Sequence, residues 1–310
     1  MKITQDRLNQ QNNASNLSVL LIGGYGYIGS YLQSKLQQAG ISYSICDDLR
    51  RGNPLGIRGL EQDYSMLGVD YCSQFDVVLW FAGHSSVQRA LDDPVGALDN
   101  NCINLFRLAR NLNPSTKLIY ASTASLYSSI KSGDVLASSE KDLVQIPYQN
   151  AYDMSKFTFD YMSENFLSNC YAIRMGTVSG FSPNLRAELL FNAMNISAVT
   201  KGEVIVKNKN SYRTILLLDD LWLLIKALLE RDAQPGVYNA GSFSGTIGQF
   251  SKWIASAWDA RVVDQGSSET YSFLLDTSRM DELIECDRIR IPIEQHSRNF
   301  IDDCRSANSL

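Results

Sequence analysis

The sequence lacks the features of several protein classes. Its 310 residues contain no apolar run near the roughly 20 residues that a membrane-spanning helix needs, so no membrane partner is expected. Basic residues number 28 against 33 acidic ones, and no basic stripe alternates with aromatic side chains. The formal net charge of −5 gives no electrostatic basis for binding nucleic acid, which is not expected as a partner.

Signals for metals, disulfides and secretion are also missing. The six cysteines occur singly, without a CxxC pair or a zinc-site spacing, which predicts reduced thiols and no metal site. Only two histidines are present, and nothing supports a Ser-His-Asp arrangement around them. Residues 1–17 lack the apolar segment of a signal peptide, so they are interpreted as a polar N-terminal extension of a cytoplasmic protein.

A regular alternation of short apolar strands and helical segments begins at residue 18. The predicted strands are 18–22, 41–46, 75–82 and 116–122. Helical periodicity follows the first strand and recurs in the region of residues 97–112. Because near-continuous apolar strands need cover on both faces, this pattern predicts an α/β protein with a parallel sheet and crossover helices.

The regular alternation ends near residue 175. Short strands are predicted at 203–207 and 212–218, an amphipathic helix at 218–230, and a further strand at 236–242 that returns to the main sheet. We therefore predict a dinucleotide-binding domain at residues 18–175, completed by 236–242, and a small lobe formed mainly by residues 176–310.

A glycine-rich segment, GGYGYIG, joins the first predicted strand to the first predicted helix. Gly23, Gly26 and Gly29 would permit a tight turn, close approach to a pyrophosphate and close packing of the helix on the sheet. The helix start, with Tyr27 and Ile28, would offer free N–H groups to the phosphates. A dinucleotide-binding loop is therefore predicted, with a turn that serves geometry alone as the alternative.

An acidic residue follows at the end of the second strand. Asp47 lies where a carboxylate accepts hydrogen bonds from the adenosine ribose, and it would repel a 2′-phosphate. NAD is therefore favoured over NADP, although Arg50 and Arg51 lie nearby. The alternative for Asp47 and Asp48 is a solvated turn.

Candidate catalytic residues lie further along the chain. Tyr152 and Lys156 are four residues apart in a helical segment, so they share a face on which the ammonium could lower the pKa of the phenol. Such a phenol can act as general base toward a sugar hydroxyl and as general acid toward a ketone. A surface pair is the alternative. Ser122, Thr123 and Ser125 follow a predicted strand, at the end where open α/β sheets place ligands.

An ordered set of motifs resembles the extended short-chain dehydrogenases/reductases, specifically the nucleotide-sugar epimerases and dehydratases, over about residues 18–242. The motifs are GGYGYIG, the Asp47-Asp48-Leu49 turn, FAGHSSV, DNNCINL, STASLY, YDMSK, RMGTVSG and YRTILLLDDL. The resemblance implies a Rossmann-type doubly wound parallel sheet with a small C-terminal substrate-binding lobe.

The resemblance also implies roles for individual residues. Tyr152 resembles the family's catalytic base, Lys156 its partner that also binds the nicotinamide ribose, and Thr123 the group that bonds the reacting hydroxyl. The remaining positions are Asp63 beside the adenine, Ala82 at the cofactor, His84 and Ser85 at the substrate, and Arg213 at the nucleotide-sugar phosphates. A surface strand arginine is the alternative for Arg213.

Three departures from the family pattern restrict the reaction. Ala124 and Ser125 occupy the positions of the acids that 4,6-dehydratases and decarboxylases carry, so those two reactions are not expected. Gly176-Thr177 replaces an asparagine of the sugar site, and no second phosphate-binding arginine is evident before DTSRMDEL.

The sequence therefore predicts an NAD-dependent nucleotide-sugar epimerase that acts at C4 through a transient 4-keto intermediate. An NAD(P)H-dependent reductase of a 4-keto nucleotide-sugar is the first alternative, and a non-catalytic dinucleotide-binding regulator is the second. A homodimer formed through two helices of the dinucleotide-binding domain is expected from the resemblance. The sugar, the nucleotide and the pathway are left open.

Overall fold

The computed structural model describes residues 17–129, 137–142, 150–268 and 270–310. The N-terminal extension expected from the sequence lies outside the described residues, apart from Leu17. Within the described ranges, no helix has the length and apolar character needed to cross a membrane.

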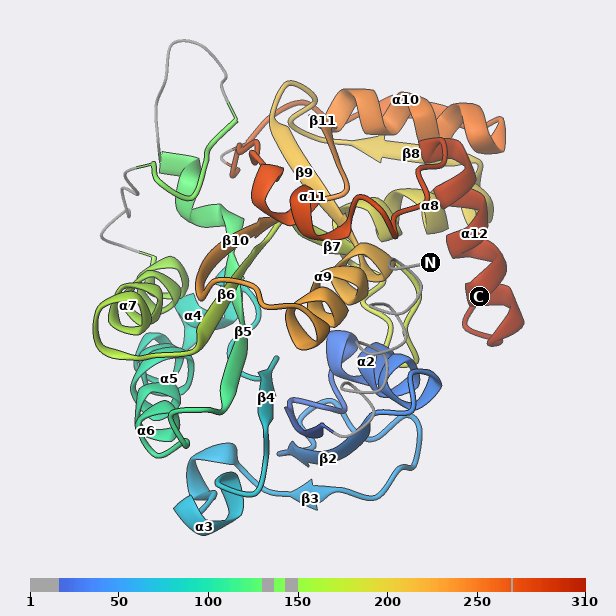
Figure 1. Ribbon diagram of the computed structural model, residues 1–310. Helices are drawn as coiled ribbons and strands as arrows, with labels where there is room; N and C mark the ends of the chain where they lie inside the picture. The colour runs from blue at the N-terminus through green and yellow to red at the C-terminus, as the bar shows by residue number, and fades with distance from the viewer. Residues whose placement is uncertain (1–16, 130–136, 143–149, 269) are drawn as a thin grey trace, which may run out of the picture.

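A seven-stranded sheet forms the centre of the molecule, with the strand order β10-β6-β5-β4-β1-β2-β3 and every neighbouring pair parallel (Figure 1). The strands are β1 (Ser18–Ile22), β2 (Ser42–Asp47), β3 (Leu60–Glu61), β4 (Val77–Trp80), β5 (Lys117–Thr123), β6 (Cys170–Met175) and β10 (Gly236–Ala240). The order reverses between β1 and β4, where open sheets bind ligands. The predicted α/β class and Rossmann-type sheet are confirmed.

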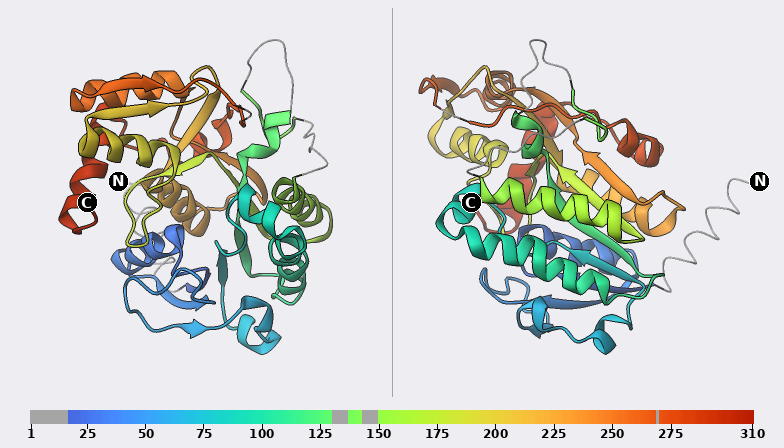
Figure 2. Two further views of the ribbon diagram at one scale, coloured as in Figure 1. Left: turned by 180° about the vertical axis from the view of Figure 1, so that it is seen from behind. Right: turned by 90° about the vertical axis from the view of Figure 1, so that its left-hand side faces the viewer.

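Successive residues of each strand point to opposite faces, and both faces are covered by helices. Val19 and Leu21 of β1 pack toward α2 and α9, whereas Leu20 and Ile22 pack in the core beneath α6 and α7. The first face carries α2 (Tyr27–Gln38), α9 (Leu218–Glu230) and α11 (Ser278–Ile284). The second carries α4 (Val87–Asp92), α5 (Pro94–Leu98), the π-helical η2 (Asp99–Ile103), α6 (Asn104–Arg110) and α7 (Ala151–Phe166), which lie side by side in Figure 2.

Short elements connect these layers. They are the 3₁₀ turns η1 (Tyr64–Met66) and η3 (Ala124–Ser129), and α3 (Val69–Cys72). Helix α7 begins at a side-chain cap, because Asn150 Oδ1 accepts hydrogen bonds from the backbone N–H groups of Tyr152 (3.1 Å) and Asp153 (3.2 Å). This cap fixes the first turn of the helix that carries the predicted tyrosine and lysine.

A smaller lobe contains most of the chain after β6 (Figure 1). Its strands are β7 (Thr177–Ser179), β9 (Tyr212–Leu217) and β11 (Phe243–Thr246) in one sheet, and β8 (Glu203–Val206) and β12 (Arg261–Asp264) in another. Its helices are α8 (Leu190–Lys201), α10 (Ile247–Trp258) and α12 (Ile293–Ser306). The lobe has its own core, in which Phe191, Ile215 and Phe250 are buried. The strand from Gly236 pairs with β6 in the main sheet, so the two parts are joined more than once.

Candidate active site

One cavity of about 400 Å³ lies at the carboxyl ends of β1, β2 and β4. Of the residues that the sequence assigns to the cofactor, those on its wall are Gly23, Gly26, Tyr27, Ile28, Asp47, Asp63 and Ala82. Gly29 lies one position further into α2, at the contact of the helix with the loop. The tertiary structure thus gathers the predicted dinucleotide site from three separate strand ends.

The glycine loop fits a pyrophosphate. A Cβ on Gly29 would lie 2.0 Å from the carbonyl oxygen of Gly23, so only glycine permits this contact between helix and loop. Gly23 has φ +80°, which favours glycine. A Cβ on Gly26 would meet only the Gly23 oxygen, at 3.4 Å, and α2 has no side-chain cap there. The first N–H groups of α2 therefore face the cavity as an anion-binding site.

Asp47 is held in the cavity wall by two backbone donors. Its carboxylate accepts hydrogen bonds from the N–H groups of Tyr25 at 2.9 Å and Leu49 at 2.8 Å. Partial burial raises the pKa of this carboxyl, and the two backbone bonds act against that rise. Nearby, Arg50 forms an ion pair with Asp48 at 2.7 Å. That pairing offsets the charge of Arg50, which supports the preference for NAD.

A second cavity of about 350 Å³ adjoins the first. The two share Tyr27, Ile28, Phe81, Ala82, His84, Ser85 and Arg186. The predicted catalytic residues Thr123, Tyr152 and Lys156 line the second cavity, and Arg213 reaches it from β9 of the small lobe. The structure therefore brings all the residues predicted for catalysis and substrate binding onto one continuous hollow.

Tyr152 and Lys156 lie on one face of α7, and the net pKa of the Tyr152 phenol is raised, not lowered. Lys156 Nζ donates a hydrogen bond of 2.9 Å to the carbonyl oxygen of Ala121 and lies 4.4 Å from the centre of the Trp80 ring. Burial lowers the pKa of Lys156 to about 7, against the charge of Asp160. Burial likewise raises the pKa of Tyr152 to about 12, because it outweighs the lowering by the Thr123 hydrogen bond and by Arg186.

A chain of polar side chains extends from Thr123 on the cavity wall through Ser125 to a buried carboxylate. The Thr123 and Ser125 hydroxyl oxygens lie 2.8 Å apart, and Thr123 Oγ1 also accepts the Ser125 N–H at 3.2 Å. Ser125 donates in turn to Asp153, which is 1% exposed. Sequence reasoning missed Asp153, although its position next to Tyr152 was visible.

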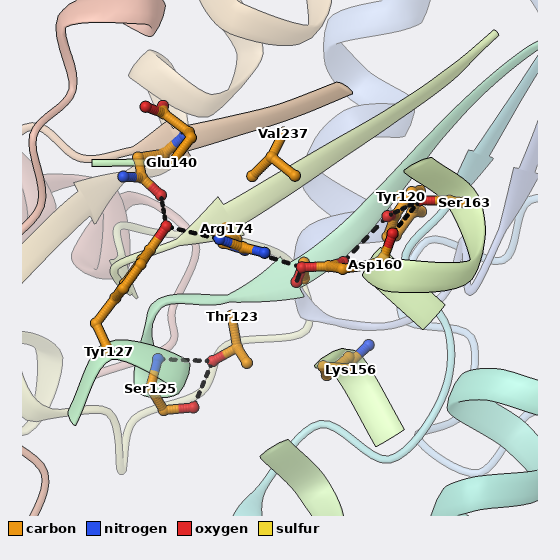
Figure 3. Close-up of polar contacts among 12 residues, drawn as sticks. Tyr120, Thr123, Ser125, Tyr127, Glu140, Lys156, Asp160, Ser163, Arg174 and Val237 are labelled. Carbon is orange, nitrogen blue, oxygen red and sulfur yellow. Dashed lines mark hydrogen bonds and ion pairs between the residues drawn. The ribbon is translucent and has the colours of Figure 1, made fainter. Parts of the chain in front are cut away.

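A buried ion pair lies beside the lysine. Arg174 on β6 contacts Asp160 on α7 at 2.9 Å and donates a hydrogen bond of 2.8 Å to the Tyr127 hydroxyl, as Figure 3 shows. Asp160 also accepts hydrogen bonds from Tyr120 at 3.0 Å and Ser122 at 2.8 Å. Because three side chains donate to the Asp160 carboxylate, the pair fixes α7 to β5 and β6 directly behind Thr123 and Lys156.

The second cavity is lined by two arginines. Arg213 is held by the Tyr212 carbonyl at 2.9 Å and by Thr270 at 2.8 Å, and burial lowers its pKa to about 10. Arg186, which sequence reasoning missed, lies after β7 and forms an ion pair with Glu188 at 2.7 Å. Its loop has no strand or helix pattern that could have placed it, so only the fold identifies it.

The two histidines lie in different surroundings. His84 lines both cavities and lies 3.3 Å from Asp93, whereas His296 stacks on Phe243 in the small lobe. Among the described residues, no group of three or more His, Cys, Asp or Glu side chains could hold a metal ion.

Comparison with known proteins gives one family. The family model described as "NAD dependent epimerase/dehydratase family" matches residues 19–241. A UDP-glucose 4-epimerase of Halalkalibacterium halodurans is 25% identical over 268 residues, covering 74% of this chain and 76% of that protein. A UDP-glucose 4-epimerase of Lacticaseibacillus casei is 28% identical over 46% of this chain, and the match spans 45% of that protein's length.

Solved structures share the fold. The UDP-glucose 4-epimerase of Thermotoga maritima, determined with UDP-glucose, has a TM-score of 0.79 and 18% identity, covering 94% of this chain and 100% of that one. An NAD-dependent NDP-hexosamine 5,6-dehydratase of tunicamycin biosynthesis also has a TM-score of 0.79, with 23% identity, covering 94% of this chain and 98% of that one. Epimerases and dehydratases are therefore both among the neighbours.

Proposed function

The chain belongs to the NAD-dependent epimerase/dehydratase family, with NAD as the cofactor, and we propose that it is a nucleotide-sugar epimerase that acts at C4. The observation that carries this proposal is the convergence of Thr123, Tyr152 and Lys156 on one wall of the hollow that adjoins the glycine loop. A protein that only bound a dinucleotide would not need these three side chains together.

The proposed cycle needs two acceptors at C4 of the sugar. One takes the proton of the C4 hydroxyl, and the other takes the hydride from the carbon itself. NAD, when bound, supplies the site that takes up the hydride and later returns it. Tyr152 receives the proton of the C4 hydroxyl and gives it back to the 4-keto intermediate after the sugar has turned. Lys156, fixed by the Ala121 carbonyl, stands one helical turn away with a pKa near neutrality. Binding of the nucleotide part would hold the sugar in place for these transfers.

The wall of the catalytic cavity favours epimerisation over elimination. Among the described residues that line it, none is an aspartate or a glutamate. Elimination of water from a keto sugar needs an acid and a base beside the leaving hydroxyl, in addition to the tyrosine. Asp153, the carboxylate that lies close to this wall, is separated from the cavity by Ser125.

Arg213 and Arg186 are proposed to bind the diphosphate of the substrate. They line the same cavity, and guanidinium groups form strong charge-assisted hydrogen bonds with phosphate oxygens. His84 and Ser85 are proposed to contact the sugar, because both lie where the two cavities meet. UDP-glucose is the first substrate to test, since the relatives named above are UDP-glucose 4-epimerases. The homodimer stays a prediction.

The test is turnover of nucleotide-sugars by the purified protein. A panel that includes UDP-glucose is incubated with the protein and NAD, and NMR spectra report the configuration of the product at C4. We expect an equilibrium of C4 epimers without net formation of NADH. Stoichiometric consumption of NADH with a 4-keto substrate would instead identify the reductase, and absence of turnover across the panel would contradict both.

Tyr152→Phe removes the proposed base and should lower kcat by about 10²- to 10⁴-fold, the usual contribution of general acid–base catalysis. Tyr161→Phe is the matched control, because Tyr161 lies on the same helix and is 54% exposed. Its kcat should stay within about twofold of wild type. Equal activity of Tyr152→Phe and wild type would contradict the proposed mechanism.

A further inference from the structure

Trp80 lies at the carboxyl end of β4, directly before the loop that the two cavities share. Its side chain is 0% exposed, whereas the next two residues, Phe81 and Ala82, line both cavities. The Tyr64 ring packs nearly perpendicular to the indole, with the ring centres 5.9 Å apart. A Cβ on Gly83 would lie 2.9 Å from the indole atom Cη2, so the loop also closes tightly on the ring. The indole is therefore held in one orientation behind this loop.

The face of the indole lies against the ammonium of Lys156. Lys156 Nζ is 4.4 Å from the centre of the ring, within the range of a cation–π interaction. The ring comes from β4, and the acceptor of the Nζ hydrogen bond, the Ala121 carbonyl oxygen, comes from the neighbouring strand β5. Two adjacent strands thus supply the contacts that hold the end of a side chain from α7.

The Lys156 ammonium has few other direct partners inside the protein. It carries three N–H donors, and within the described ranges the Ala121 carbonyl is the one acceptor to which Nζ donates. No carboxylate of the same ranges forms an ion pair with it. The carboxylate whose charge acts on it, Asp160, is itself paired with Arg174 at 2.9 Å. The indole face is consequently one of two direct contacts that stabilise this buried charge.

We propose that Trp80 is a positioning residue, whose indole face keeps the Lys156 ammonium charged and in place on the wall of the catalytic cavity. The inference rests on the proposed function, because it requires that Lys156 assist Tyr152 in taking a proton from the sugar. It assigns a task in the reaction to a tryptophan that lines neither cavity.

Burial by itself works against a charged lysine at this position. It lowers the pKa of Lys156 to about 7, and the charge of Asp160 opposes that fall only in part. The face of an aromatic ring attracts a cation electrostatically, and tryptophan does so more strongly than tyrosine or phenylalanine. An indole at 4.4 Å therefore favours the ammonium over the neutral amine without adding another buried carboxylate to the core.

The charge of the lysine bears on the proton transfer of the proposed cycle. Tyr152 can take the proton of the C4 hydroxyl only as a phenolate, and a cation one helical turn away stabilises that anion. The neutral amine gives no such stabilisation. The kcat of the enzyme should therefore fall as the pH rises through the pKa of Lys156, and the indole moves this fall to a higher pH than burial alone would allow.

Several titratable and charged groups surround Lys156, and substitution of Trp80 leaves all of them in place. A change in the titration of Lys156 therefore reports the ring. The groups are Tyr152 and Asp160 on α7, Tyr120 on β5, Arg174 on β6, Tyr64 on η1 behind the indole, His84 on the same cavity wall, and Arg186, which acts on Tyr152.

The experiment weakens the ring face while it keeps the shape of the side chain. A trifluorinated tryptophan, incorporated at position 80 alone, has nearly the volume of tryptophan but a much weaker negative potential on its face. The same analogue at position 222 is the matched control, because Trp222 is a buried tryptophan of α9 that packs on the other face of the sheet. Trp80→Phe, which keeps a weaker ring, completes the series.

The first measurement is the pKa of Lys156 in the protein without NAD, from carbon NMR of labelled lysine. Lys156→Met identifies the signal. We expect the fluorinated residue at position 80 to lower this pKa by about one pH unit, and Trp80→Phe to lower it by less. The fluorinated residue at position 222 should leave it unchanged.

The second measurement is the pH profile of kcat for the NAD-bound enzyme with UDP-glucose. With the fluorinated residue at position 80, the alkaline limb should move to lower pH by the same interval. Above the wild-type limb, kcat should therefore be lower by about 10-fold, with KM within about threefold of wild type. A tryptophan that only filled space would leave the limb in place.

The outcomes are distinct. A lowered pKa of Lys156 together with a displaced alkaline limb supports the positioning role. Wild-type turnover with an unchanged limb in the fluorinated protein, or an unchanged pKa of Lys156, overturns the role of Trp80 and leaves the epimerase intact. Absence of wild-type turnover across the panel of nucleotide-sugars removes the proposed function and the positioning role with it.

Discussion

Helix α7 carries two buried aspartates, two turns apart on one face, and only one of them has a cationic partner among the described residues. Asp160 lies against the guanidinium of Arg174 at 2.9 Å, whereas Asp153 receives hydrogen bonds from a serine, a tyrosine and an asparagine. Each is 1% exposed. Burial alone therefore does not decide what a carboxylate does at this site.

The difference teaches how one helix can hold two buried carboxylates with unlike partners, one cationic and the others neutral. A carboxylate that is paired with a buried arginine is fixed as an anion, because its protonation would leave the guanidinium unpaired. A carboxylate that is bound only by neutral donors can gain a proton at a smaller cost. Asp160 accordingly serves to attach α7 to β6, whereas Asp153 is bound only by the neutral side chains of Ser125, Asn150 and Tyr271.

Among changes to the two aspartates and their partners, removal of the Arg174 guanidinium should have the largest effect on the free energy of unfolding. Arg174→Met leaves Asp160 buried without its partner, and we expect the free energy of unfolding to fall by about 3–5 kcal/mol. Urea denaturation measures this change. The double variant Arg174→Met/Asp160→Asn should recover a large part of the loss, because no buried charge is then left unpaired. A loss below about 1 kcal/mol for Arg174→Met would show that the pair does not fix the helix.

Neutralisation of Asp153 should change the free energy of unfolding much less. Asp153→Asn keeps the same number of neighbouring donors and acceptors, so its free energy of unfolding should differ from wild type by about 1 kcal/mol or less. The same denaturation series measures it, with Asp160→Asn as the matched substitution seven residues away. Equal destabilisation by the two substitutions would contradict the distinction between Asp160, which is paired with a cation, and Asp153, which is bound by neutral donors.

The smallest effect is a dependence of stability on pH. The pKa of Asp153 is raised in the folded state, so the folded protein binds this proton more tightly than the unfolded chain does. Its contribution to stability is therefore complete below the ordinary carboxyl pKa and is lost as the pH rises through the raised pKa. Relative to Asp153→Asn, wild type should gain stability as the pH falls from 7 toward 4. Denaturation at several pH values would show the opposite slope if the pKa were lowered.

Much of the fold could be predicted from local patterns. Strand β1 and helix α9 have the predicted bounds, because apolar runs and helical periodicity are properties of contiguous residues. The last part of the chain was not assigned. Helices α10, α11 and α12 bury their apolar faces in the small lobe or on the outer face of the sheet, and their pattern alone does not say where they pack.

The residues of the candidate site also fall into two groups, those that local sequence patterns predict and those that only the fold brings to the cavity. Gly23, Gly26 and Gly29, together with Asp47, could be found because one strand-turn-helix unit and the next strand carry them in a fixed order. The net pKa of the Tyr152 phenol is raised rather than lowered, since burial is a property of the whole fold and outweighs the local hydrogen bond with Thr123. Arg186 and Tyr271 gave no local signal, because loops bring them to the cavity from distant positions.

The sequence by itself determined the glycine loop, the alternation of strands and helices up to β5, and the residue types available for proton and hydride transfer. The tertiary structure decided which of those residues meet. Asp153 follows Tyr152 in the sequence, but whether it lies beside a cation or among neutral donors depends on β6, η3 and the segment before α11. Charge partners and burial are set by elements far apart in the chain, and a local pattern holds no information about them.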